Sequence, residues 1–105
     1  MKGPSRVIAL VFSYDVGADV GEFERIHGPE GEWAGFFKGG RGYIGTELLA
    51  DVEDPRRYLV VDRWESREAY NEFVAANRDE YMRRVDESAF RYAHELRLGT
   101  FESVW

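Results

Sequence analysis

The sequence contains no cysteine, and this absence limits the chemistry that the chain can perform. Disulfide bonds, thiolate metal ligands and a cysteine nucleophile are excluded, and the chain does not match the small secreted scaffolds that disulfides hold together. The two histidines, His27 and His94, are far apart and lie in no metal-binding motif. We therefore expect no metal site.

Basic clusters and long apolar runs are lacking as well. Acidic residues outnumber basic residues by 20 to 14, for a net charge of −6, and no run of Lys and Arg is long enough to follow a phosphate backbone. The apolar run at residues 7–12 is too short to cross a bilayer and lacks a signal-peptide cleavage pattern. We expect no nucleic-acid partner, no membrane association and a cytoplasmic location.

Two familiar motifs give no support for an activity. Gly40, Gly42 and Gly45 match the dinucleotide pattern GxGxxG, but they close a predicted helical region and open a predicted strand. A dinucleotide fingerprint follows a strand and opens a helix, so we interpret these glycines as structural. The chain has no GxSxG sequence, so a serine hydrolase is not expected.

Apolar and aromatic residues are plentiful, at 44% and 15% of the chain. This content argues against disorder and indicates more apolar surface than a small monomer hides easily, which favours a dimer or a lined pocket. A length of 105 residues suits one domain, which we take as residues 1–105.

Hydrophobic patterning predicts four strands and two helical regions. The strands are expected at residues 6–14, 43–52, 57–64 and 95–104, the helical regions at 18–38 and 66–93. Gly28 and Pro29 interrupt the first helical region, and residues 77–79 break the second.

Smaller features are predicted as well. Gly39 and Gly40, glycines able to take positive φ, end the first helical region, and His94 ends the second. The last strand is expected to place Leu96, Leu98 and Thr100 on one side, together with Glu102 and Val104.

This order, strand, helix, strand, strand, helix, strand, is that of the ferredoxin-like α+β fold. It predicts a four-stranded antiparallel sheet with both helical regions on one face. The opposite face would be bare and apolar in a monomer, so we expect a homodimer that forms through the sheet face.

Residues 58–70 are central to the functional interpretation. Alternation places Val60, Asp62 and Trp64 on one face of a strand, and Ser66 caps the helix that carries Tyr70. These side chains could wall a pocket in which Asp62 is the polar group and an arginine of the second helical region supplies positive charge. Alternatively, the aromatic rings belong to the core and Asp62 pairs with Arg63 or Arg84. His27 either faces such a pocket or lies at a helix end.

The run YLVVDRWESREAY at residues 58–70 and the run GYIGTELL at residues 42–49 resemble the antibiotic biosynthesis monooxygenase-like family of dimeric α/β barrel proteins. The resemblance covers nearly the whole chain. It implies two ferredoxin-like subunits packed sheet against sheet, each with a pocket between its sheet and its helices.

One branch of that family oxidises aromatic polyketide precursors to quinones with molecular oxygen and without flavin, haem or metal. Its pocket carries a tryptophan, a tyrosine six residues later and an arginine twenty residues later, which correspond to Trp64, Tyr70 and Arg84, or to Arg83 if a gap is placed in the helix. That branch also has an asparagine four residues before the tryptophan, where this chain has Val60. Asp62 is a possible substitute that would act as a base.

A second branch degrades haem with a tryptophan and a histidine. The nearest positions here are Phe73 and Arg83, so haem degradation is not expected.

The resemblance therefore implies a homodimeric oxidoreductase, a cofactor-independent monooxygenase of the antibiotic biosynthesis type, acting on a small aromatic, phenol-like molecule. In this hypothesis Trp64 and Tyr70 shape the pocket, Arg84 stabilises a phenolate or enolate and Asp62 takes the proton. The expected substrate-binding residues are Val60, Phe73 and His27. Two alternatives stay open: a non-oxidative cyclase or isomerase on the same scaffold, and a dimer that binds a small ligand without chemistry.

Overall fold

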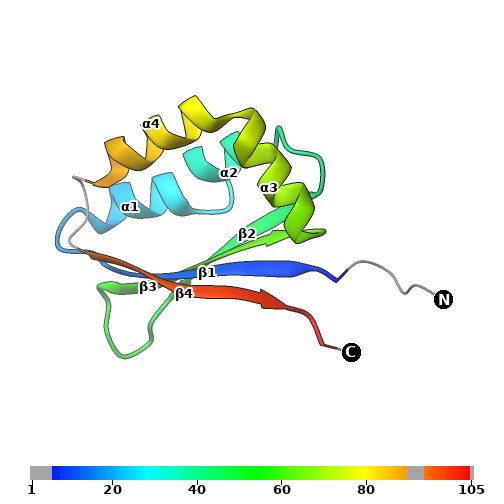
Figure 1. The fold of residues 1–105 in the computed structure, drawn as a ribbon. Coiled ribbons are helices and arrows are strands. Elements are labelled where there is room, and N and C mark those ends of the chain that lie inside the picture. Colours follow the sequence, from blue (N-terminus) through cyan, green and yellow to red (C-terminus); the bar gives the residue numbers. More distant parts are fainter. Residues whose placement is uncertain (1–5, 90–93, 105) are drawn as a thin grey trace.

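The computed structural model describes residues 6–89 and 94–104, and it places helices over one side of a single sheet (Figure 1). The elements follow in the order β1 (Ile8–Asp15), α1 (Val20–His27), α2 (Glu32–Phe37), β2 (Tyr43–Ala50), β3 (Arg57–Trp64), α3 (Arg67–Ala76), α4 (Arg78–Ala89) and β4 (His94–Glu102). This order confirms the predicted ferredoxin-like α+β fold, with each helical region divided in two. Within the described ranges no helix has the length and apolarity of a membrane span.

The sheet is antiparallel throughout, in the strand order β2-β3-β1-β4. Pairing between β1 and β3 sets Ile8 opposite Trp64 and Leu10 opposite Asp62. Because directly opposed residues in antiparallel strands share a face, the pairing confirms that Val60, Asp62 and Trp64 lie on the same side. That side faces the helices, since Ile8 and Trp64 pack into the core beneath them.

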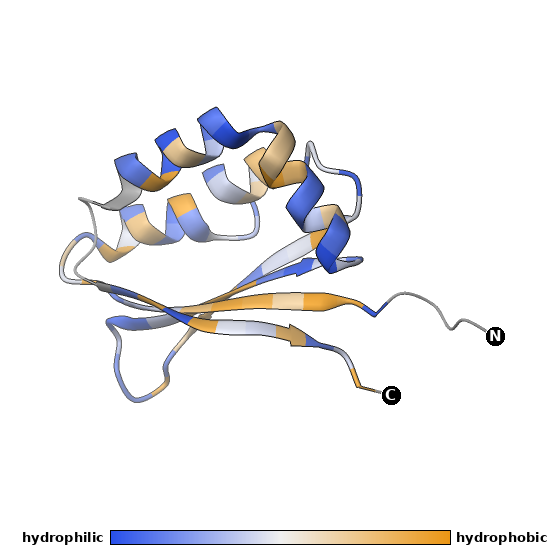
Figure 2. Cartoon of the chain, viewed as in Figure 1, coloured by the Kyte–Doolittle hydropathy of each residue, from blue (hydrophilic) through white to orange (hydrophobic). Residues whose placement is uncertain are grey.

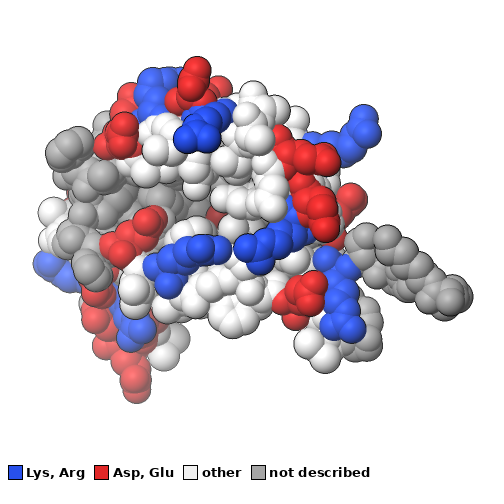
Figure 3. Space-filling model, in the orientation of Figure 1, with Lys and Arg blue, Asp and Glu red and all other residues white. Residues whose placement is uncertain are grey.

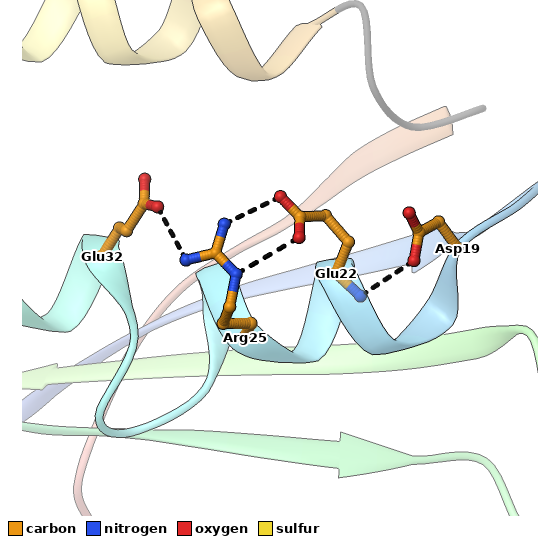
Figure 4. A network of polar contacts seen from close by, with 4 residues as sticks. All are labelled: Asp19, Glu22, Arg25 and Glu32. Carbon is orange, nitrogen blue, oxygen red and sulfur yellow. Dashed lines mark hydrogen bonds and ion pairs between the residues drawn. The ribbon is translucent and has the colours of Figure 1, made fainter.

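The predicted break at Gly28 and Pro29 separates α1 from α2. Arg25 joins the two helices, donating hydrogen bonds to Glu22 at 2.7 Å and to Glu32 at 3.0 Å (Figure 4). In the same network Asp19 caps α1 by accepting a hydrogen bond from the Glu22 amide at 3.2 Å. These charges are solvent-exposed, so the network orients the two helices and adds little stability.

The second helical region begins and divides as predicted. The Ser66 hydroxyl accepts a hydrogen bond from the Ala69 amide at 3.1 Å and caps α3. At Asn77 the side-chain amide donates to the carbonyl of Phe73 at 2.9 Å, which competes with continuation of the helix and starts α4 in a new direction. His94 begins β4 instead of ending a helix, and residues 90–93 lie outside the described residues.

The turn between α2 and β2 corrects one expectation. Neither Gly39 nor Gly40 has positive φ; the glycine that does is Gly42, with φ of 95°. Gly40 is required for space: a Cβ there would lie 2.7 Å from the Trp64 ring and 2.8 Å from the Phe73 ring. The glycines of the GxGxxG sequence follow a helix and open a strand, as expected, and serve packing and chain reversal.

The prediction that Leu96, Leu98 and Thr100 share one side of the last strand was wrong. The register between β1 and β4 shifts, so Gly99 is paired with Val11 and Arg97 with Phe12 while Leu98 has no partner in the register. Gly99 has φ of 147°, a conformation that favours glycine and accommodates this β-bulge. As a result Thr100 and Arg97 both face the helices, and Leu96 faces the other side.

Two clusters of buried side chains form the core. The first surrounds Trp64 with aromatic rings from α2 and α3, and its buried members are Ile8, Leu10, Phe36, Phe37, Trp64 and Phe73. The second lies towards α1 and consists of Tyr14, Val16, Phe23, Tyr58 and Val60. Figure 2 shows the apolar residues running along β1, beneath helices whose outer surfaces are polar.

The face of the sheet away from the helices carries apolar side chains. One row crosses all four strands in register and consists of Leu49, Leu59, Ser13 and Leu96. Leu49, Leu96 and Phe101 on this side are about half exposed, at 46%, 53% and 52%. We call this face, defined by the row and Phe101, the outer sheet face.

The packing at Gly40 gives a stability prediction. Gly40→Ala should lower the free energy of unfolding by about 2 kcal/mol, because the new methyl group collides with two buried rings. Gly35→Ala is the matched control: a Cβ there meets nothing within 4 Å, and alanine favours the α2 helix by up to about 1 kcal/mol. Urea denaturation of both variants measures the difference, and equal stability of the two would contradict the close packing.

Candidate functional site

A cavity of about 230 Å³ lies between the sheet and helices α3 and α4. β1 and β4 contribute one wall and the helices the other. The lining residues are Ile8, Leu10, Phe12, Arg67, Tyr70, Asn71, Tyr81, Arg97 and Thr100. The β1 side chains make an apolar wall, while hydroxyl, amide and guanidinium groups supply polar contacts from the other elements.

Tyr70 and Tyr81 form the helical side of the cavity and are joined by a hydrogen bond. Burial, and then this hydrogen bond, raises the pKa of Tyr70 above its ordinary value. Tyr70 therefore stays protonated at neutral pH and offers a neutral hydroxyl to a ligand. A neutral phenol of this kind can donate a hydrogen bond to an oxyanion.

Positive charge enters the cavity from two sides. Arg97 comes from β4 and donates a hydrogen bond from Nη2 to the Thr100 hydroxyl at 2.7 Å, and Arg67 comes from the first turn of α3. None of the residues that line this cavity is acidic, although the chain has a net charge of −6. Figure 3 shows basic side chains in a row across the middle of the molecule, with acidic side chains towards both ends.

Asp62 is on β3, opposite the cavity-lining residue Leu10 on β1, and is not itself among the lining residues. It is 8% exposed and accepts a hydrogen bond from the Thr46 hydroxyl at 2.6 Å, and Thr46 is in turn 2.5 Å from the Tyr43 hydroxyl. Burial raises the pKa of Asp62 to about 6, against the opposing effect of the Thr46 hydrogen bond. A carboxylate with this pKa is ionised at neutral pH and basic enough to accept a proton in a reaction.

Trp64 supports the cavity from the core. The indole is fully buried and meets the Tyr70 ring edge to face, with ring centroids 5.5 Å apart. Phe73 packs on the other side of the indole at 5.5 Å. Among the described residues no acceptor reaches the indole Nε1. The tryptophan fixes the position of Tyr70 and is not itself among the cavity-lining residues.

The other residues expected at the site lie elsewhere. Val60 is buried in the second core cluster, and His27 is buried with its ring stacked 4.5 Å from Phe23. Arg84 pairs with Glu80 at 2.8 Å and covers the Phe36 ring. None of these lines the cavity, whereas Tyr70 does.

The alternative partners considered for Asp62 are engaged in other contacts. Arg63 forms an ion pair with Glu47 on the outer sheet face, and Arg84 forms its ion pair within α4. The hydrogen-bond partner of Asp62 is Thr46.

Sequence reasoning missed most of the lining residues. Arg97 and Thr100 are three positions apart and would lie on opposite faces of a regular strand. The signal that could have placed them together was Gly99, because a glycine within an edge strand often marks a bulge. Asn71 and Arg67 lacked any such signal. Within the described part of the chain, no three His, Cys, Asp or Glu side chains are grouped to hold a metal ion.

The fold and the cavity together define a small α+β domain with a ligand pocket between its sheet and its helices. Comparison with protein families identifies which class of such domains this is. The family described as antibiotic biosynthesis monooxygenase matches residues 36–95, and the chain belongs to that family.

Solved structures share the fold. SnoaB, a cofactor-independent oxygenase from Streptomyces nogalater, superposes with a TM-score of 0.67 at 17% sequence identity, covering 95% of each chain. A candidate antibiotic biosynthesis monooxygenase from Bordetella bronchiseptica superposes with a TM-score of 0.62 at 24% identity, covering 95% of this chain and 99% of the other. No curated protein sequence matches.

Two buried groups give opposite pH effects on stability. Burial lowers the pKa of His27 to about 4, so acidification below pH 6.5 protonates the unfolded chain first and destabilises the fold. The pKa of Asp62 is instead raised, so acidification below about pH 6 protonates the folded protein first and stabilises it.

These effects should nearly cancel in the wild type and appear in single variants. Between pH 7 and 4.5, His27→Gln should gain about 2 kcal/mol of unfolding free energy relative to the wild type. Between the folded and unfolded pKa values of a group, each pH unit changes the unfolding free energy by about 1.4 kcal/mol. Asp62→Asn should lose about as much over the same interval. Urea denaturation at both pH values measures this, and parallel pH profiles for all three proteins would refute the two burial effects.

Proposed function

We propose that the protein is a cofactor-independent monooxygenase that oxidises a small phenol-like aromatic molecule with molecular oxygen. The observation that carries the proposal is the cavity, which combines an apolar wall, a neutral tyrosine hydroxyl and basic groups next to a carboxylate of raised pKa. Membership of the antibiotic biosynthesis monooxygenase family and the fold shared with SnoaB support it.

The reaction inserts one oxygen atom and releases the other as water. A phenol with a free para carbon loses its hydroxyl proton, and the electron-rich phenolate transfers an electron to O₂. The phenoxyl radical and superoxide combine at the para carbon, and the peroxide then loses water to leave a para-quinone. The substrate and O₂ thus account for all atoms and electrons of the quinone and water, the chemistry for which other oxygenases employ a flavin or a metal.

The chain's own residues have three roles in this proposal. Asp62 accepts the phenolic proton, Tyr70 donates a hydrogen bond to the phenolate oxygen, and Trp64 holds the Tyr70 ring in place. Stabilisation of the phenolate by Arg84 remains a prediction. Because Arg84 pairs with Glu80 and covers the Phe36 ring, its test must separate an effect on packing from an effect on turnover. If Arg84 contributes only to packing, Arg84→Ala will lower stability and leave turnover unchanged.

Oxygen consumption tests the proposal. With 1-naphthol as substrate, the wild type should consume O₂ and form 1,4-naphthoquinone, and kcat/KM should rise with pH through about 6 as Asp62 ionises. Asp62→Asn should lower the rate by about 10²-fold or more and abolish this pH limb. Tyr70→Phe and Trp64→Phe should also be slower.

Arg78→Ala, an exposed α4 position that does not line the cavity, is the matched control and should behave as the wild type. Turnover without O₂ would instead indicate a cyclase or isomerase. Absence of any turnover across a panel of hydroxylated aromatics would overturn the proposal.

We further propose that two copies associate through the outer sheet face. Exposed apolar patches of this kind mark interfaces, and the face would otherwise leave Leu49, Leu96 and Phe101 in water. Light scattering should give the mass of a dimer for the wild type. Leu96→Glu should shift the mass to that of a monomer, because it places a charge in the interface.

Val52→Glu is the matched control for the dimer, since Val52 is 99% exposed between β2 and β3 and lies off the outer sheet face. A monomeric wild type, or equal effects of the two variants, would exclude this interface.

A further inference from the structure

We propose that Arg97 and Arg67 form an anion-binding subsite of the cavity, which selects aromatic substrates of one or two rings that carry a carboxylate. This inference rests on the proposed function for the reaction, and it adds the class of substrate. Neither arginine corresponds to the position Arg84 that the sequence suggested.

The bulge in β4 is what directs Arg97 to the cavity. In the register, Arg97 is opposite Phe12 and Thr100 is opposite Leu10, and both of these β1 residues line the cavity. Without the extra residue at Leu98 and Gly99, one of the two side chains would point to the outer sheet face. The backbone at Gly99 thus places a guanidinium where a regular strand could not.

A hydrogen bond to Thr100 holds Arg97 in place. The bond to Thr100 uses one of the five N–H donors of the guanidinium. Two glutamates share this face of β4: Glu95 accepts a hydrogen bond from the Tyr14 hydroxyl, and Glu102 is opposite Ile8, at the other end of the strand from Arg97. Asp62 accepts a hydrogen bond from Thr46. Glu95 and Asp62 therefore have hydrogen-bond partners other than Arg97.

The two arginines lie on the solvent side of the cavity. Arg97 and Arg67 are exposed, whereas the β1 side chains Ile8 and Leu10 are buried. A carboxylate bound by the arginines keeps part of its hydration while the aromatic ring rests on the apolar wall, so neither charge incurs full desolvation. Arginine suits this task because its planar fork matches a carboxylate.

The topology also sets the orientation of the substrate. Asp62 is on β3 and Arg97 is on β4, and β1 lies between these strands. Neighbouring strands are about 4.8 Å apart, and Arg97 is opposite Phe12, two residues along β1 from the Leu10 that is opposite Asp62, so the two residues are separated by roughly 12 Å. A ring lying over β1 can direct its hydroxyl towards Asp62 and its carboxylate towards Arg97.

The cavity volume limits the size of the substrate. Pockets for drug-sized ligands have volumes of about 300 to 1,000 Å³, and a cavity of about 150 Å³ accepts benzene. A volume of about 230 Å³ lies between these values. It fits one ring or two fused rings with small substituents and is too small for a chain of four fused rings.

Binding calorimetry with a matched pair of probes tests the subsite. The probes are 5-hydroxy-1-naphthoate and 1-naphthol, which differ only in the carboxylate, and this carboxylate lies at the opposite end of the ring system from the hydroxyl. The wild type should bind the carboxylated probe about tenfold more tightly, and Arg97→Gln should reduce this preference below threefold, because a charge-assisted hydrogen bond is lost. Arg67→Gln should reduce it as well, and added salt should weaken it in the wild type.

Arg78→Ala is again the matched control and should keep the tenfold preference. Equal affinity of the wild type for the two probes, or a preference above threefold in Arg97→Gln, would overturn the subsite. Binding is measured without turnover, so the subsite can fail while the wild type still oxidises 1-naphthol. Conversely, a preference that depends on Arg97 with no O₂ consumption supports the subsite and rejects the monooxygenase.

Discussion

The register of β1 against its two neighbours is the constraint on which the rest of the structure depends. Pairing with β3 places Trp64 and Asp62 under the helices, and pairing with β4 places Thr100 and Arg97 there. A shift of one residue would move each set to the opposite face, because side chains alternate along a strand. The core, the cavity and the apolar outer sheet face therefore all depend on the same pairing.

Much of the fold could be predicted because local signals agreed with one another. The apolar run of β1, the break at Gly28 and Pro29, and the Ser66 cap each act over a few residues, and the structure contains all three. The alternation that grouped Asp62 with Trp64 also held, since β3 pairs regularly with β1 along its length. Where a strand is regular, sequence spacing is enough to assign faces.

The cavity was harder to predict because it depends on irregular backbone and on long-range packing. One bulge at Gly99 changes which side of β4 each residue occupies, and spacing rules that assume a regular strand fail beyond it. Helix α4 starts in a new direction after Asn77, so the contacts of Tyr81 with Tyr70 and of Arg84 with Phe36 follow from tertiary packing. Helical periodicity indicates an apolar face but not which strand that face meets.

The charges around the cavity are arranged so that binding assists the proposed reaction. An anionic substrate held at Arg97 brings a second negative charge towards Asp62, and a nearby like charge raises the pKa of a carboxylate. Asp62 would then be a stronger base when the substrate is bound than when the cavity is empty. The Arg97 guanidinium offsets the repulsion between the substrate carboxylate and Asp62. Because Arg97 binds the far end of the ring, it does not neutralise Asp62 directly. In this proposal, the separation of the two charges by β1 would allow one layer of the sheet to bind an anion and to accept a proton from it.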